Sequence, residues 1–169
     1  MKIINIKVKD LSQKTFSSYG TVLRPKIDKP TYSNNEFDLW LGIDNIVSVN
    51  NAQISWLSLK TKRELTCNKL ERHMKSSESI IPMQGRSIII VGISKKSSYK
   101  DLVDFESISA FHMDGSSGVN LSPGVWHWIP YPLTNYANFL LILGEDIDKN
   151  DLEIINLEER FGLKFKIDL

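Results

Sequence analysis

The chain has 169 residues, of which 41% are hydrophobic and 24% are charged. This length and composition suit a single globular domain over residues 1–169 with a sizeable core, and they argue against wholesale disorder. The 21 basic residues nearly balance the 20 acidic ones, so no long-range field favours nucleic acid or an acidic membrane as a partner. A small-molecule substrate remains compatible with this balance.

The single cysteine, Cys67, excludes an intramolecular disulfide, and so low a cysteine content favours a reducing cytoplasm. The first residues alternate polar and apolar side chains and lack the continuous apolar core of a signal peptide. The longest apolar run near the middle, residues 88–93, is too short to span a bilayer. We therefore expect a soluble, cytoplasmic protein.

The N-terminal part predicts a strand, a short helix and a loop. Residues 2–8 alternate as a strand does, and Asp10 or Ser12 can cap a helix that runs through Phe16. An extended piece and then a loop with two prolines are expected at residues 21–23 and 24–35.

Beyond this loop, short apolar segments alternate with turn residues. We predict strands at residues 37–41, 46–49, 54–60, 65–73, 79–82, 87–94, 108–113, 119–121, 125–130 and 136–143. The segment 87–94 is apolar on both faces, which is typical of a buried strand. Residues 151–169 fit either a strand or a short helix. Many short strands with little helical periodicity predict an all-β sandwich or barrel.

One stretch gathers groups that bind metals. In an extended strand Glu71 and His73 share a face while Arg72 points to the other. Glu78 follows after a short polar link, and His127 lies far along the chain. Two imidazoles with one or two carboxylates suit zinc, nickel, manganese or iron better than calcium.

A structural interpretation of the same residues stays open. Glu71 and His73 can decorate an exposed strand face, with Arg72 buried or paired. His127, between Trp126 and Trp128, can be a packed core histidine. The third histidine, His112, follows Phe111 on a predicted strand, and we interpret it as structural.

The spacing resembles the two metal-binding motifs of the cupin superfamily. His73, Glu78 and Gly85 match the second half of the first motif, and Gly124-x-x-His127 matches the second motif. The resemblance implies a cupin-like double-stranded β-helix, or jelly-roll barrel, with minor helical elements. It also implies one divalent metal held by His73, Glu78 and His127, without an organic cofactor. At Glu71 the superfamily usually has histidine.

Within that superfamily the chain resembles the ureidoglycolate lyase family. The matching blocks are Phe16-Ser17-Ser18-Tyr19-Gly20-Thr21-Val22, Leu70-Glu71-Arg72-His73, Ile81-Pro82-Met83-Gln84-Gly85, Gly118-Val119-Asn120 and Val125-Trp126-His127. The resemblance implies a homodimeric lyase of allantoin degradation that cleaves (S)-ureidoglycolate to glyoxylate and urea. The chain departs from the family pattern at Glu78, Ser117, Trp128, Asn138 and Leu143-Gly144.

The family resemblance suggests roles for individual residues. Glu71 would be a fourth metal ligand or the general base, beside His73 and His127. Arg86 is a candidate to bind the substrate carboxylate, and Asn120 to bind the ureido group. Two alternatives remain: another metal-dependent cupin enzyme, such as an isomerase or an iron oxygenase, or a non-catalytic domain that binds a small molecule.

Overall fold

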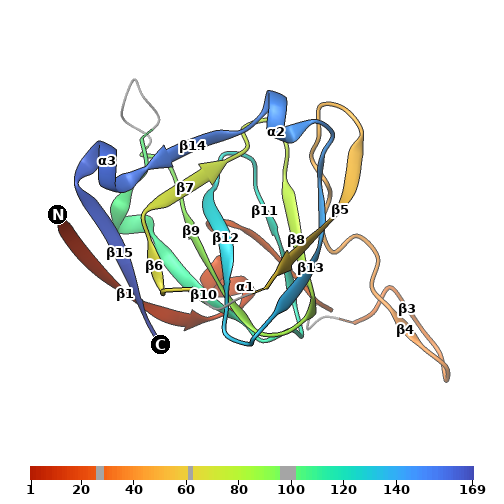
Figure 1. Ribbon diagram of the computed structural model, residues 1–169. Coiled ribbons are helices and arrows are strands. Elements are labelled where there is room, and N and C mark those ends of the chain that lie inside the picture. Colours follow the sequence, from red (N-terminus) through yellow and green to blue (C-terminus); the bar gives the residue numbers. More distant parts are fainter. Residues whose placement is uncertain (26–28, 61–62, 96–101) are drawn as a thin grey trace.

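A computed structural model describes residues 1–25, 29–60, 63–95 and 102–169 (Figure 1). The strands are β1 (Lys2–Asp10), β2 (Gly20–Leu23), β3 (Tyr32–Ser33), β4 (Asp38–Leu39), β5 (Ala52–Leu59), β6 (Thr66–Cys67), β7 (Lys69–Arg72), β8 (Glu78–Gln84), β9 (Ser87–Gly92), β10 (Ser109–Met113), β11 (Gly118–Leu121), β12 (Trp126–Pro132), β13 (Ala137–Gly144), β14 (Glu153–Asn156) and β15 (Leu163–Asp168). The helices are α1 (Gln13–Phe16), the 3₁₀ turn η1 (Phe105–Ser107), α2 (Ile147–Asn150) and α3 (Leu157–Phe161).

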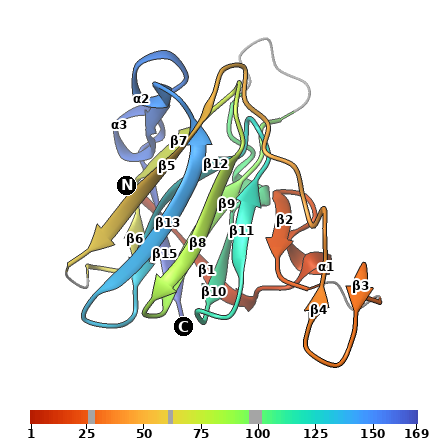
Figure 2. The same ribbon diagram turned by 90° about the vertical axis from the view of Figure 1, so that its right-hand side faces the viewer.

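Two curved sheets face each other across the molecule (Figures 1 and 2). The larger has the strand order β14-β7-β12-β9-β10-β1-β15-β6, and the smaller has the order β2-β11-β8-β13-β5. From β7 to β14 the chain passes back and forth between them, with β8, β11 and β13 in the smaller sheet. This winding is that of a double-stranded β-helix, so the predicted all-β, cupin-like barrel with short helices is confirmed.

Two apolar cores lie on the two faces of the larger sheet. Strand β9 contributes to both, because Ile88 and Ile90 enter the first cluster while Ile89 and Val91 enter the second. The second cluster, which we call the inter-sheet core, also takes up Ile80 and other side chains of the smaller sheet. All six residues of β9 are buried. The prediction of a buried strand, apolar on both faces, is therefore confirmed.

The short helices settle two open points of the sequence. Ser12, rather than Asp10, caps α1, because its side chain accepts a hydrogen bond from the Thr15 backbone N–H. The C-terminal stretch contains both predicted alternatives, since β14 and β15 flank the one-turn helix α3. No helix within the described residues is long and apolar enough to cross a membrane.

The predicted strand at residues 46–49 is wrong. The backbone of Val47 exchanges hydrogen bonds with Ser77, accepting from its N–H and donating to its hydroxyl, instead of joining a sheet. The predicted loop at 24–35 falls partly outside the described residues. Its end forms β3, which pairs with β4 in a small hairpin that projects from the barrel (Figure 1).

The thiol of Cys67 is buried in the first cluster, on the face of the larger sheet opposite the inter-sheet core. Burial raises the pKa of this thiol to about 11, and the thiolate is the species that attacks thiol reagents. We therefore expect no reaction of the native protein with a disulfide reagent at pH 8, and one equivalent after denaturation, measured by the absorbance of the released thiol. Fast labelling of the native protein would contradict this burial.

Candidate active site

Strand alternation turns His127 into the space between the sheets. On β12 its neighbours Trp126 and Trp128 point to the opposite side, where both pack in the first cluster, as expected for side chains outside the barrel interior. Across the strands, His127 is paired with Val91 of the inter-sheet core on one side and with Glu71 on the other. His127 is therefore both buried and directed toward the second sheet.

The other polar groups reach the same place from two more segments. Glu71 on β7 alternates with buried Leu70 and with Arg72, so it shares the inner face with His127. His73 follows the end of β7, and Glu78 begins β8 opposite Leu121 of the inter-sheet core. The structure thus brings these four side chains together.

The distances define a compact centre. Glu78 Oε2 lies 2.9 Å from His127 Nε2 and 3.5 Å from His73 Nε2. One potential ligand atom from each of these three buried residues lies within 4.8 Å of the others. Glu71 stands slightly apart, with Oε1 3.8 Å from His127 Nε2, and it is half-buried.

Backbone carbonyls fix the orientation of both imidazoles. His73 Nδ1 lies 2.8 Å from the Asp151 carbonyl oxygen, and His127 Nδ1 lies 3.1 Å from the Val125 carbonyl oxygen. A carbonyl only accepts, so each Nδ1 carries the proton and donates it. In the neutral rings each Nε2 then presents a lone pair to the centre, the arrangement typical of metal-binding histidines.

This arrangement leaves two buried atoms without a hydrogen-bond partner among the described residues, namely His127 Nε2 and Glu78 Oε2. When the imidazole is neutral, both are electron-pair donors that face each other, which is costly in a buried place. A proton or a metal cation between them removes that cost. Two imidazoles and one carboxylate form a ligand set that suits a divalent transition metal, so these residues fit such an ion.

A turn holds His73 from its other side. The backbone N–H of Gly124 donates to the His73 carbonyl at 2.6 Å, which links the two motif halves directly. Gly124 has a φ of +82°, a conformation that glycine adopts without the steric cost of a side chain. The turn that leads into β12 therefore also anchors His73.

The environment gives the two carboxylates opposite properties. Burial opposes ionisation of Glu78, but both imidazoles outweigh it and lower the pKa of Glu78 to about 2. Burial raises the pKa of Glu71, against the opposing effect of His127, and the Glu78 carboxylate raises it further. Glu78 is thus a permanent anion, whereas Glu71 is the better group to exchange a proton.

Arg86 and Asn120, the two predicted substrate-binding residues, are not brought to this centre. Arg86 is exposed beyond the far end of β8 and lines a separate cavity with Thr134 and Tyr136. Asn120 alternates with two residues of the inter-sheet core, so its side chain points away from that core.

The amide of Asn120 is instead fully occupied by other groups. It donates to the Asp44 carboxylate and the Asn45 carbonyl, and it accepts from the Ser79 hydroxyl. Asn120 therefore fastens the loop at residues 44–45 to the outer side of the smaller sheet.

The remaining predicted residues also lie outside the centre. Arg72 faces away from it, as expected, and it is both buried and paired. Its guanidinium contacts Glu153 at 2.7 Å and stacks over Trp126. His112 lies on β10 and does not belong to the group that could hold a metal ion.

Sequence reasoning missed Asp151, which touches both His73 and the link that leads to Glu78. It lies in a polar stretch between α2 and β14. It contacts the ring of His73 through its backbone carbonyl and the link through its side-chain carboxylate. The only available signal was the aspartate directly before the apolar segment that became β14.

Proton linkage at Glu78 and His127 has a defined sign in the metal-free protein. Glu78 contributes stability that is present above its unfolded pKa of 4.5 and is lost as the pH falls toward 2. Burial opposes the charged form of His127, but Glu78 and Glu71 outweigh it and raise the pKa of His127. Its contribution is therefore full below its unfolded pKa of 6.5 and is lost as the pH rises through the raised value.

We expect the difference in unfolding free energy between the wild type and Glu78→Gln to be largest between about pH 4.5 and 6.5 and to shrink on both sides. Chemical denaturation in the presence of a chelator, from pH 3 to pH 9, measures this difference. A difference that does not change with pH would show that the two groups are not coupled.

Comparisons with known proteins identify similar sequences and structures. The family model for ureidoglycolate lyase matches residues 3–164. Ureidoglycolate lyases from Escherichia coli (strain SMS-3-5 / SECEC) and Shigella boydii serotype 18 are each 30% identical in an alignment 166 residues long that covers 92% of this chain and 98% of theirs.

Solved structures align over parts of the chain. A dTDP-4-dehydrorhamnose 3,5-epimerase from Elizabethkingia anophelis NUHP1 covers 64% of this chain and 56% of its own, at 14% identity and a TM-score of 0.43. An oxalate decarboxylase from Bacillus subtilis covers 65% and 25%, at 9% identity and a TM-score of 0.42. On the match of the family model to nearly its whole length, this chain belongs to the ureidoglycolate lyase family.

Proposed function

We propose that this protein cleaves (S)-ureidoglycolate to glyoxylate and urea, as part of allantoin degradation in the cytoplasm. The observation that carries the proposal is the buried group of His73, Glu78 and His127, with the half-buried Glu71 beside it, in a chain of this family. We further propose that residues 1–169 act as one domain. The parallel pairing of β1 with β15, which joins the two ends of the sequence in one sheet, supports this.

His73, Glu78 and His127 would hold one divalent metal ion, for which nickel, zinc, manganese and iron are the candidates. Such an ion, when bound, supplies Lewis-acid polarisation of substrate oxygen atoms. The support is the pair of unsatisfied buried atoms, Glu78 Oε2 and His127 Nε2, and the Nδ1–H tautomer of both rings.

Glu71 is suited to move the proton that the reaction requires. The substrate carbon carries a hydroxyl group and a ureido nitrogen. Cleavage removes the hydroxyl proton, forms the C=O bond of glyoxylate, and breaks the C–N bond. The same proton, carried by the Glu71 carboxylate, then completes the NH₂ group of urea. Because burial raises the pKa of Glu71, this carboxylate is both a better base and a more readily protonated acid than Glu78.

A second candidate follows from the same ligand set. Two histidines and one carboxylate also form the facial triad of non-haem Fe(II) enzymes that activate oxygen. Family membership favours the lyase, and consumption of dissolved oxygen separates the two chemistries.

Substitutions at the centre should separate metal binding from proton transfer. We expect His73→Ala and His127→Ala each to abolish urea release, because each removes a ligand. Glu71→Gln should lower kcat by about 10²–10⁴-fold while metal content stays at the wild-type level, since only the acid–base group is lost. A urea assay combined with metal analysis of the purified proteins measures both effects.

His112→Ala is the matched control, because His112 is the third histidine and lies outside the centre. It should retain wild-type urea release. Wild-type activity in His73→Ala or His127→Ala would remove the site assignment. A wild-type protein that releases no urea with any of the four metals would remove the lyase proposal.

We also propose that the protein forms a homodimer through its exposed apolar side chains. Ile54 and Trp56, on the edge strand β5, are 73% and 57% exposed. The β3–β4 hairpin and the loop after it also expose Phe37, Leu39 and Leu41, but they lie on the β2 side of the barrel, away from β5 (Figure 2). A bare edge strand with exposed apolar side chains, such as β5, is usually covered by a partner.

The dimer proposal predicts a specific disruption. Trp56→Glu should convert a dimer to a monomer, because it places a charge in the apolar surface, whereas Ile3→Glu, at a residue 52% exposed on β1, should not. Size-exclusion chromatography with light scattering measures the molar mass. A monomeric wild-type protein, or a dimeric Trp56→Glu protein, would contradict the proposed interface.

A further inference from the structure

We propose that Asp151 is a positioning residue that sets the orientation of His73 and the distance from His73 to Glu78. This inference rests on the proposed metal centre. It concerns a residue that contributes no proposed ligand and that lies 73 positions after Glu78 along the chain. The backbone carbonyl of Asp151 acts on the ring of His73. Its carboxylate acts on residues 74–76, which link His73 to Glu78.

The backbone of Asp151 acts on the ring of His73. Its carbonyl oxygen lies 2.8 Å from His73 Nδ1 and accepts the ring proton. This contact holds the ring in the tautomer that leaves Nε2 free for a metal, and it restricts rotation of the ring. The carbonyl is itself held, because the Asp151 N–H donates to the carbonyl of Ile147, the first residue of α2.

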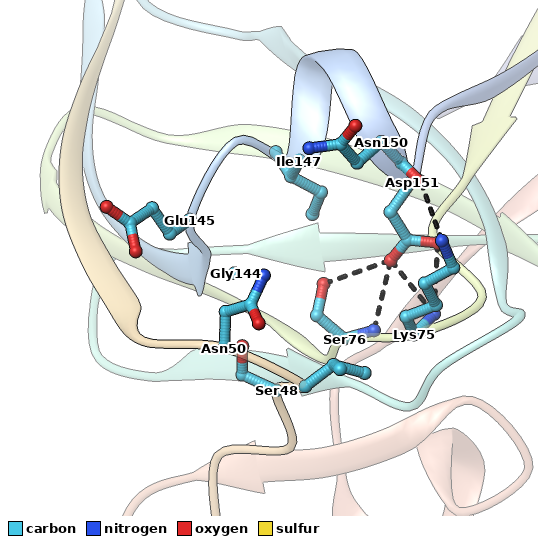
Figure 3. Close-up of a pocket in the computed structure, with 10 residues that line it drawn as sticks. Ser48, Asn50, Lys75, Ser76, Gly144, Glu145, Ile147, Asn150 and Asp151 are labelled. Carbon is cyan, nitrogen blue, oxygen red and sulfur yellow. Dashed lines mark hydrogen bonds between the residues drawn. The ribbon is translucent and has the colours of Figure 1, made fainter.

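The side chain of Asp151 acts on the link between His73 and Glu78. Its carboxylate accepts from the backbone N–H groups of Met74, Lys75 and Ser76 and from the Ser76 hydroxyl, at 2.7–3.3 Å. Figure 3 shows the contacts with Lys75 and Ser76 converging on this carboxylate. Three consecutive N–H groups bound to one anion give the link a single conformation.

The two contacts together constrain the ligands from one point. His73 precedes the link directly, and Glu78 follows it after Ser77, whose N–H donates to the Val47 carbonyl. Lys75 adds a further tie through its ammonium group, which donates to the Asn150 carbonyl. The separation of 3.5 Å between His73 Nε2 and Glu78 Oε2 therefore depends on a link whose every backbone N–H from residue 74 to residue 77 is engaged.

The segment that carries Asp151 is well placed for this role. Strand β14 follows it directly and pairs with β7, which carries Glu71, in the register Ile154 to Glu71. The ion pair of Glu153 with Arg72 reinforces the same pairing. Asp151 is thus fixed relative to the strand that ends just before His73.

Two variants of Asp151 test the proposal, with Zn²⁺ as the probe. Asp151→Ala removes all the side-chain contacts. Asp151→Asn keeps one oxygen for Met74 and Lys75, but it turns an amide N–H₂ group toward the Ser76 N–H. We expect both to bind Zn²⁺ about 10–100-fold more weakly than the wild type, as for other residues that orient metal ligands. Competition against a chromophoric chelator measures the dissociation constants.

A second measurement does not involve the metal. In the metal-free wild type, a long-range ¹H–¹⁵N spectrum of the imidazoles should show His73 as the Nδ1–H tautomer. In Asp151→Ala the ring should become a mixture of tautomers, because loss of the carboxylate releases residues 74–76 and lets His73 move away from the carbonyl of residue 151. The signal of His127, anchored by Val125, should not change.

Two controls exclude a general loss of stability. Asp148→Asn alters an exposed carboxylate on α2, three residues away, and Ile155→Ala creates a cavity in the first cluster. Both should retain wild-type Zn²⁺ affinity, Ile155→Ala despite a lower melting temperature.

The proposal is overturned if both Asp151 variants keep the wild-type affinity and tautomer. It is also overturned if Ile155→Ala loses as much affinity as they do. A wild-type protein that binds no Zn²⁺, nickel, manganese or iron would refute the metal centre itself, while the tautomer of His73 still tests the action of Asp151.

Discussion

The rest of the structure depends on the close approach of two buried atoms. His127 Nε2 and Glu78 Oε2 lie 2.9 Å apart in the space between two sheets. Neither atom has a hydrogen-bond partner among the described residues. An isolated carboxylate in such a place normally takes up a proton, yet the two imidazoles keep Glu78 ionised and hold its pKa at about 2. The protein therefore keeps an ionised carboxylate beside two imidazoles, where a proton or a metal cation can lie between Glu78 and His127.

The surrounding structure keeps these groups from relaxing away. Val125 and Asp151 hold the far nitrogens of the two rings, and Gly124 holds the backbone of His73. Glu71 lies on the neighbouring strand β7 and has the opposite pKa shift, because burial and the Glu78 charge both favour its protonated form. The cluster thus combines Glu78, which stays ionised, with Glu71, which can take up and release a proton. The proposed acid–base chemistry beside a metal requires both properties.

Much of this was predictable because strands alternate strictly. In Trp126-His127-Trp128, alternation places the histidine on the inner face and both tryptophans on the outer face. In Leu70-Glu71-Arg72 it places Glu71 on the inner face and its two neighbours on the outer face. The buried strand β9 was equally clear, since no polar residue interrupts Ile88–Val91. Spacing alone could locate His73, Glu78 and His127, because the motif fixes how many residues the connecting turn must contain.

The misplaced residues fail for a common reason. Arg86 and Asn120 were chosen for chemical type, but β8 carries Arg86 to the far end of the barrel, and alternation turns Asn120 outward. The strand expected at residues 46–49 had the right side chains, but Val47 found its hydrogen-bond partners in Ser77. Asp151 escaped notice because a carbonyl oxygen has no sequence signature. Sheet length decided the position of Arg86, side-chain alternation that of Asn120, and backbone contacts across the chain the other two cases.

The pairing of β14 with β7 and of β15 with β1 has a consequence for how the chain folds. Both contacts join segments that are distant in sequence, so their loop closure is entropically costly and forms late. During synthesis, Glu71 and His73 emerge well before Asp151 and β14 can reach them. The residues of the proposed metal centre therefore pass through a period with one open strand edge and an unanchored His73 ring, in which nonspecific metal capture or pairing with another chain competes with correct closure.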